Sequence, residues 1–421
     1  MLTRRSALGL GAAAATPLPR WPGQTPTALR TLLFVSRGNS GFLNPDKRLE
    51  LVNEDGSRLR PLFRQNEDGA GFGCYGFFRD GRAILQSLTL PKDWRQRTFD
   101  DYYQRSRARL WTCDFRNGRL TEICHAQRLS SFYSFCCLLP GEARAAVTVM
   151  RGGKSVLYTM NLDGAEPRAI TGPDEFVYGV SLSPDGRRFA FHSNYRIHVC
   201  QIDGSGRVEL AGKPGTLYFG SSWSPDGEWV LFQVCDSQSD PAHDWSAIAM
   251  ARAAGGEPVR MLTGPASAWF GASYGTRANP GGGSNQLQWA PDGSGILYVR
   301  RIPDSVTPWV FQTQRKDTDH FNRDFVPEDS RGGTYLVVID PRTGSERLLT
   351  QPANGVWDFR AAWSPDSRKI CFLRAPVGAA PELCVTDATA AGATPKRLSS
   401  GLRRAGAEHP VWVPAAASLQ R

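Results

Sequence analysis

The sequence predicts an all-β fold, a seven-bladed β-propeller whose blades are four-stranded antiparallel sheets. Two observations predict it. A short turn sequence recurs between pairs of apolar runs, and each end of the repeat array carries one incomplete copy. Repetition at intervals of ~40–50 residues is typical of propeller blades, which bury their faces against their neighbours.

The recurring sequence is a Pro-Asp turn that joins the first two strands of a blade. Its clearest copies lie at 183–186, 224–227, 290–293 and 364–367, and degenerate copies lie at 77–82 and 138–142. Proline presets φ at the first turn position, and Asp-Gly completes the reversal. A large apolar residue precedes each clear copy and an apolar run follows it. The repeating unit is therefore strand, turn, strand.

A glycine turn marks a second hairpin in each blade. These turns lie at 53–56, 116–118, 162–164, 202–204, 254–256, 341–344 and 391–392. They outnumber the complete first hairpins by one. The missing first strand is at 410–414, where Trp412 stands two places before Pro414, and its partner is the unpaired second strand at 32–35. We expect these segments to pair and close the ring, which removes exposed sheet edges. The alternative is six blades with an irregular excursion around 74–124.

The Pro-Asp repeats resemble those of the TolB-type propeller family and cover nearly the whole chain after its first residues. The resemblance implies the blades only, because the α/β domain that precedes the propeller in TolB is not expected here. Such repeats occur in colicin-import proteins, peptidase propellers and polysaccharide lyases, so the resemblance implies a fold rather than an activity.

The N-terminal segment is typical of an export signal. Arg4 and Arg5 precede a short, mildly apolar stretch rich in Ala and Gly, as in twin-arginine signals, although Ala7 departs from the usual pattern. An ordinary secretory signal is the alternative. We expect cleavage after Ala15, a signal and linker at 1–27, one propeller at 28–414 and a tail at 415–421, with a periplasmic or secreted protein as the product. No other segment is apolar and long enough to span a membrane.

The charge limits the classes of ligand that we expect, and the cysteine count bears on disulfide pairing. The formal net charge is +10, from 50 basic and 40 acidic residues, which fits acidic glycans or anionic surfaces but requires neither. Without a Lys/Arg run or an RNA-binding aromatic motif, nucleic acid is not expected. Nine cysteines leave one or more unpaired in a monomer, the state that we expect. Cys371 and Cys384 flank a short loop, so either a cross-strand disulfide or two buried thiols fits them.

Strand order places the short turns at one end of the blades and every long insertion at the other, which we call the upper face. The insertions are 88–107, 235–246, 265–285 and 301–333. Long loops on a rigid scaffold commonly carry function. Aromatic rings beside Arg, His and Asp suit sugar stacking and carboxylate capture, although such residues also cap loop backbones. The candidate binding residues are Trp94, Arg97, Tyr102, Trp245, Trp269, Asn279, Lys316, His320, Arg323 and Trp357.

Two functions fit these loops. The first is an exported module that holds an acidic polysaccharide or an envelope protein on its upper face. The second is a polysaccharide lyase acting on a uronate-containing polymer. β-Elimination needs a cation, a base and an acid, for which Arg277, His243 and Tyr274 are the candidates. Whether the chain is an enzyme stays open.

A serine hydrolase is not expected. The sequence at 271–275 spells G-x-S-x-G, but a glycine-rich segment follows where the nucleophile elbow needs a helix. No cofactor is required by either function. The six histidines lack local ligand spacing, so a divalent metal stays an option only at a site gathered from different blades, with His243, His320 and nearby Asp residues as the first ligands.

Overall fold

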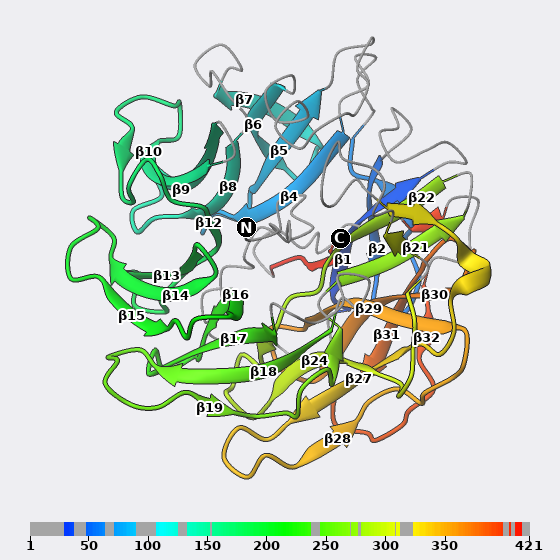
Figure 1. The fold of residues 1–421 in the computed structure, drawn as a ribbon. Helices are drawn as coiled ribbons and strands as arrows, with labels where there is room; N and C mark the ends of the chain where they lie inside the picture. Colours follow the sequence, from blue (N-terminus) through cyan, green and yellow to red (C-terminus); the bar gives the residue numbers. More distant parts are fainter. Residues whose placement is uncertain are drawn as a thin grey trace.

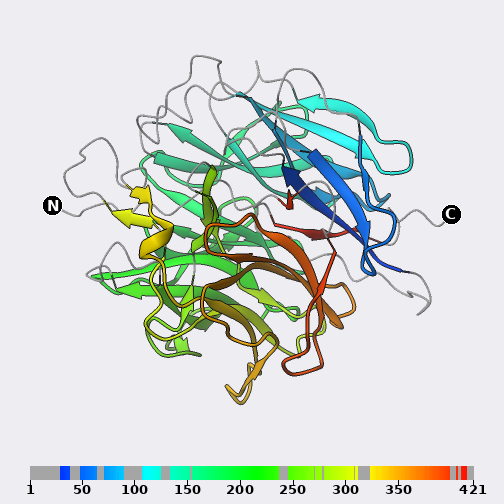
Figure 2. The same ribbon diagram turned by 90° about the vertical axis from the view of Figure 1, so that its right-hand side faces the viewer.

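The computed structural model describes residues 29–37, 48–63, 71–89, 107–124, 133–151, 154–236, 245–269, 271–276, 279–307, 309–311, 323–398, 404–405 and 409–414. Within these ranges the secondary structure is β-strand, with one short 3₁₀ turn at Pro327–Asp329 and no α-helix. The predicted all-β class is confirmed. Figures 1 and 2 show the sheets arranged in chain order around a common centre.

Each blade is an antiparallel four-strand ladder in chain order. The ladder that joins the two ends of the chain contains β34 (Val411–Trp412), β1 (Thr31–Arg37), β2 (Arg48–Asn53) and β3 (Arg60–Pro61). The next contains β4 (Gly71–Phe77), β5 (Ala83–Thr89), β6 (Arg107–Asp114) and β7 (Arg119–Cys124). A third ladder contains β8 (Tyr133–Leu138), β9 (Arg144–Arg151), β10 (Lys154–Asn161) and β11 (Arg168–Ala169). A fourth contains β12 (Val177–Leu182), β13 (Arg188–Ser193), β14 (Arg196–Gln201) and β15 (Val208–Ala211).

The remaining ladders are linked at their edges. The fifth contains β16 (Thr216–Trp223), β17 (Trp229–Asp236), β18 (Trp245–Arg252) and β19 (Arg260–Met261). The sixth contains β23 (Gln288–Trp289), β24 (Ile296–Arg301), β27 (Thr334–Ile339) and β28 (Glu346–Leu348). The seventh contains β29 (Val356–Trp363), β30 (Lys369–Pro376), β31 (Glu382–Asp387) and β32 (Lys396–Arg397). The short β20 (Ala268–Trp269) pairs with both β18 and β24. The number of blades in the whole chain stays a prediction, and this pairing pattern favours seven.

The predicted closure is confirmed. In β34 and β1, Trp412 pairs with Leu32 and Val411 pairs with Leu33. The Trp412 ring is 2% exposed, and its Nε1 donates to the Ala362 carbonyl oxygen at 3.1 Å. One strand that the sequence did not indicate, β33 (Arg404–Ala405), also pairs with β1. In Figure 2 the blue N-terminal strands accordingly lie beside the red C-terminal ones.

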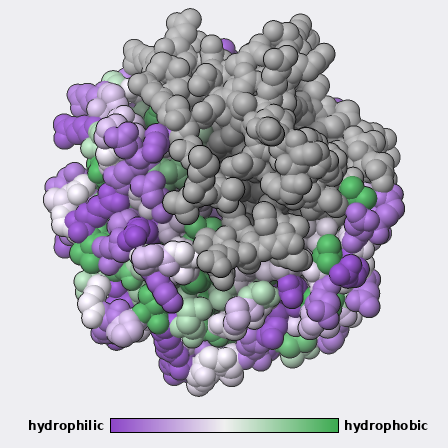
Figure 3. All heavy atoms as spheres, viewed as in Figure 1, coloured by the Kyte–Doolittle hydropathy of each residue, from purple (hydrophilic) through white to green (hydrophobic). Residues whose placement is uncertain are grey.

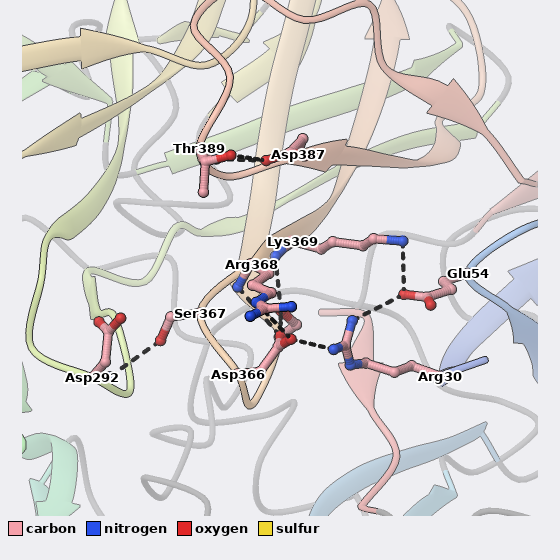
Figure 4. A network of polar contacts seen from close by, with 10 residues as sticks. Arg30, Glu54, Asp292, Asp366, Ser367, Arg368, Lys369, Asp387 and Thr389 are labelled. Atoms are coloured by element: carbon pink, nitrogen blue, oxygen red, sulfur yellow. Dashed lines mark hydrogen bonds and ion pairs between the residues drawn. The ribbon is translucent and has the colours of Figure 1, made fainter. Parts of the chain in front are cut away.

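A polar network reinforces the closure at the end of the blades that carries the Pro-Asp turns (Figure 4). Arg30, just before β1, forms ion pairs with Glu54 and with Asp366 of the last Pro-Asp turn. Lys369 reaches the same Glu54 carboxylate at 3.1 Å. These contacts join the first described residues to the final ladder.

The Pro-Asp turns form because each satisfies its own backbone. In the turn at 183–186 the Ser183 carbonyl accepts from the Gly186 N–H at 2.8 Å, and Ser183 Oγ accepts from the Arg188 N–H at 2.9 Å. Gly186 has φ +73, and a Cβ there would lie 2.6 Å from Cγ of Pro140 in the neighbouring turn. Glycine is therefore required both by the turn and by the packing of adjacent blades.

The hydrophobic core is divided among the interfaces between ladders. For example, Val199 of β14 and Phe232 of β17 share one cluster, and Phe135 of β8 shares another with Leu110 of β6. On the face seen in Figure 3, the coloured residues near the edge of the ring are mostly hydrophilic, with hydrophobic residues in small separate groups. No helix in the described part of the chain has the length and apolar character needed to cross a bilayer.

All nine cysteines are free thiols. Cys384 pairs with Phe372, whereas Cys371 pairs with Val385, so the two cysteines are offset by one residue across the ladder. Because side chains alternate between the faces of a strand, this offset places the two thiols on opposite faces. Of the two alternatives for this pair, the structure has the buried thiols.

Candidate functional site

Several of the candidate residues predicted in the insertions lie outside the described residues. His243 and Arg277, two of the three lyase candidates, lie outside the described residues, as do Trp94, Arg97, Tyr102, Lys316 and His320. Tyr274 lies on β21 (Gly271–Thr276), opposite Gly281 of β22 (Asn279–Ser284), and Asn279 begins β22. Arg323 begins β26 (Arg323–Phe325), opposite Phe311 of β25 (Trp309–Phe311). The proposed lyase arrangement therefore stays a prediction.

Three candidate tryptophans do come together, but in the core. Trp245, Trp269 and Trp357 are 4%, 1% and 1% exposed. The ring centroids of Trp245 and Trp269 are 6.1 Å apart, and those of Trp269 and Trp357 are 4.8 Å apart. The rings cover one another, so their faces are not open for stacking on a ligand.

A different aromatic group lies at the upper face of the β12–β15 ladder. We call Phe176, Tyr178, His192 and Tyr195 the aromatic quartet. The centroid of Phe176 is 4.7 Å from that of Tyr178 and 6.2 Å from that of Tyr195. The His192 ring is nearly parallel to both tyrosines, with centroids 6.0 Å from Tyr178 and 6.1 Å from Tyr195. The four rings thus form a closed circuit of contacts.

Strand register brings the quartet together. Tyr178 on β12 is directly opposite His192 on β13, and Tyr195 lies in the two-residue turn between β13 and β14. Phe176 lies just before β12, where its carbonyl oxygen accepts from the Asn194 N–H at 3.0 Å. Phe176, Tyr178 and Tyr195 are partly exposed, whereas His192 is buried. The quartet therefore presents three rings around a buried imidazole.

Glu175 fixes the segment that carries Phe176. Its carboxylate accepts from the Gly172 N–H at 2.7 Å and from Ser193 Oγ at 2.5 Å, and it pairs with Arg207 at 2.8 Å. Burial alone would raise the pKa of Glu175, but the hydrogen bonds from Arg207 and Ser193 outweigh it and lower that pKa to about 2. Glu175 is therefore an ionised anchor.

His192 connects two blades. Its Nδ1 accepts from the Gly220 N–H of β16 at 3.3 Å. Burial lowers the pKa of His192 to about 3, so the ring is neutral at pH 7 and its proton resides on Nε2. That Nε2 is buried and has no hydrogen-bond partner in the described structure. His192 thus joins the second strand of its own blade, β13, to the innermost strand of the next blade, β16, while it contacts the two tyrosine rings.

Tyr195 adopts an unusual backbone conformation. Its φ is 61° and that of Asn194 is 49°, the left-handed values that two-residue hairpin turns favour. Glycine or asparagine is usual at such positions, and a bulky residue there is strained. Strain of this kind persists where the surrounding structure enforces it, and it often marks a functional position. A tyrosine in a two-residue turn was the sequence signal that could have indicated the quartet. Sequence reasoning missed this signal because it sought candidate residues in the long insertions.

The ladders arranged around a centre, together with the pairing of the two ends of the chain, decide the architecture. The chain is a β-propeller. No family model matches the sequence. The chain is similar in structure to a periplasmic gluconolactonase of Pseudomonas aeruginosa, with a TM-score of 0.53 and 15% sequence identity over 92% of this chain and 99% of that one. It is also similar to a prolyl endopeptidase, with a TM-score of 0.52 and 10% identity over 93% of this chain and 50% of that one.

A TolB protein is also among the structures similar to this chain. TolB from Acinetobacter baumannii matches with a TM-score of 0.44 and 15% identity, over 91% of this chain and 82% of that one. At such identities a structural likeness concerns the fold and not the activity. Membership in the TolB family stays a prediction.

Proposed function

We propose that this propeller is a binding module that holds a glycan at its upper face, with the aromatic quartet as the place where a sugar ring stacks. The observation that carries the proposal is the set of partly exposed rings of Phe176, Tyr178 and Tyr195 around the buried His192. Rigid aromatic rings with adjacent polar edges offer large contact area at low entropic cost. The strained Tyr195 backbone adds support, because a simpler turn residue would serve folding alone.

The test is glycan binding by purified protein and two variants. Glycans that bind on an array are measured in solution by calorimetry with wild type, Tyr195→Ala and Trp229→Ala. Loss of the Tyr195 ring should weaken binding about tenfold, the effect of one aromatic contact of about 1.4 kcal/mol.

Trp229 is the matched control. It is a partly exposed aromatic residue beside a Pro-Asp turn, at the opposite end of the blades, where Arg252 lies 4.3 Å from its ring centroid. Trp229→Ala should bind as wild type does. Equal affinities for all three proteins, or equal losses in both variants, would remove the quartet from the binding site.

We also propose that the protein is exported, and polysaccharide lyase activity is the alternative function. Export through the N-terminal signal predicts that the protein is recovered from the periplasm or medium, and that replacing Arg4 and Arg5 by lysine retains it in the cytoplasm.

Release of unsaturated uronates from a uronate polymer, measured by ultraviolet absorbance, would instead support the lyase. If that activity appears, Arg277→Ala should abolish it.

A further inference from the structure

Arg301 is held over a buried tryptophan at the upper face. It ends β24, and its guanidinium carbon lies 4.7 Å from the Trp245 ring centroid. The Arg301 backbone N–H donates to the Ser267 carbonyl at 3.0 Å, which fixes the end of the strand next to β20. The cation is therefore positioned by two neighbouring blades and stays partly exposed.

Arg301 differs from the other arginines that stack on aromatic rings in the described structure. Arg82, Arg207, Arg252 and Arg374 stack in the same way, and each also forms an ion pair with a carboxylate. Arg188 stacks on Trp223 and donates to the Gly227 carbonyl. Within the described residues the Arg301 side chain has neither an ion pair nor a hydrogen bond.

The surroundings of Arg301 make this lack of an acceptor costly. Burial lowers the pKa of Arg301, and the charge of Asp304 opposes that effect without forming an ion pair. A partly desolvated cation is stabilised by an anion placed within contact. The structure thus leaves this cation available to an anion from outside the described chain.

We propose that Arg301 binds a carboxylate of the glycan, which makes the ligand an acidic, uronate-containing chain. This inference rests on the proposed function and names the class of its ligand. A guanidinium whose carbon lies 4.7 Å from the centroid of an aromatic ring still has N–H donors for the two parallel hydrogen bonds that a carboxylate accepts. The end of β24 and the aromatic quartet lie at the same end of the blades, opposite the Pro-Asp turns, and the +10 formal charge also favours an anionic polymer.

The experiment compares each acidic oligosaccharide with its own methyl ester, which removes the charge and nearly preserves the shape. Oligomers of galacturonate, glucuronate and mannuronate are titrated into wild type, Arg301→Gln, Arg301→Lys and Arg252→Gln at low salt. Wild type should bind one acid form about tenfold or more tightly than its ester, as expected for a charge-assisted bidentate pair. Arg301→Gln should bind acid and ester alike, and its affinity for the ester should equal that of wild type.

The two other variants separate geometry from charge. Arg301→Lys should recover only part of the preference, because an ammonium lacks the planar fork. Arg252→Gln removes a stacked arginine at the opposite end of the blades and should keep the full preference. The inference is wrong if wild type binds neutral glycans but prefers no acid form, or if Arg301→Gln keeps the wild-type ratio. Failure of wild type to bind any glycan would overturn the proposed function itself.

Discussion

Buried polar side chains connect neighbouring blades residue by residue. Gln86 Oε1 accepts from the Phe135 N–H of the next blade at 3.0 Å, and His192 Nδ1 accepts from the Gly220 N–H at 3.3 Å. Both side chains come from the second strand of a blade and contact the innermost strand of the next one. Each such contact satisfies a backbone donor between two blades, and losing it would leave that donor without this partner.

The bridge made by His192 predicts acid sensitivity. The pKa of His192 is about 3 in the folded protein and 6.5 in the unfolded chain, because burial disfavours the charged ring. The folded state therefore binds fewer protons, so the contribution of His192 to stability is complete above pH ~6.5 and is lost as the pH falls toward 3. Between about pH 7 and about pH 4.5, wild type should lose about 2 kcal/mol more stability than His192→Gln.

The measurement is urea unfolding of both proteins at the two pH values. Glutamine is the matched replacement because Gln86 makes the equivalent contact without titrating. His198, with its pKa lowered to about 4 mainly by burial, remains in both proteins. Identical losses in the two proteins would show that His192 does not charge on unfolding in this range.

At the scale of elements, the innermost strands share a β-bulge near the upper face. The register shifts between Tyr178 and Ser181 in β12, and again at the equivalent places in β16 and β29. Gly179 and Gly220 take left-handed φ values of 59° and 66° at this place, and Arg360 takes 54° in β29. A bulge increases local twist, which suits strands that converge on a central axis.

The bulge glycine of β12 has a clear mutational consequence. A Cβ at Gly179 would lie 3.1 Å from Cα of Gly220 and 3.2 Å from Nδ1 of His192. Gly179→Ala should therefore lower the free energy of unfolding by about 3 kcal/mol, from left-handed strain plus overpacking between two blades.

Gly215→Ala is the control for strain alone. Gly215 has φ +76, but a Cβ there would meet nothing within 4 Å. Its cost should be about 1–2 kcal/mol. Denaturant titrations of the two variants test the difference, and a Gly179→Ala protein no less stable than Gly215→Ala would mean that the blades separate easily to admit a methyl group.

At the scale of the whole molecule, stability depends on closing the ring. Trp412 belongs to the last described segment, yet it is fully buried between β1 and β29. Trp412→Ala should cost about 4 kcal/mol, since it removes a large core side chain and the hydrogen bond to Ala362. Because closure joins the first and last ladders, the loss should also speed proteolysis at both ends of the array.

Thermal unfolding with limited proteolysis checks this prediction, and Trp229→Ala again serves as the control. Trp229 is only partly buried and lies on β17, which takes no part in the β34–β1 pairing, so its removal should lower the melting temperature less. If the two variants melted alike, and both ends of the array resisted protease in each, closure through Trp412 would not limit stability.

Local sequence chemistry determined the fold of this protein. Pro-Asp and Asp-Gly turns act over a few residues, so each hairpin could be predicted from its own segment, and the unpaired strand at 32–35 identified its partner around Trp412. The sites depended on longer-range contacts. Strand register and a blade linker assemble the aromatic quartet from segments that are unremarkable alone, while packing between ladders buries Trp245, Trp269 and Trp357. Whether a ring faces solvent or the core is decided by neighbours distant in sequence, so only the tertiary structure could distinguish a candidate ligand platform from a piece of the core.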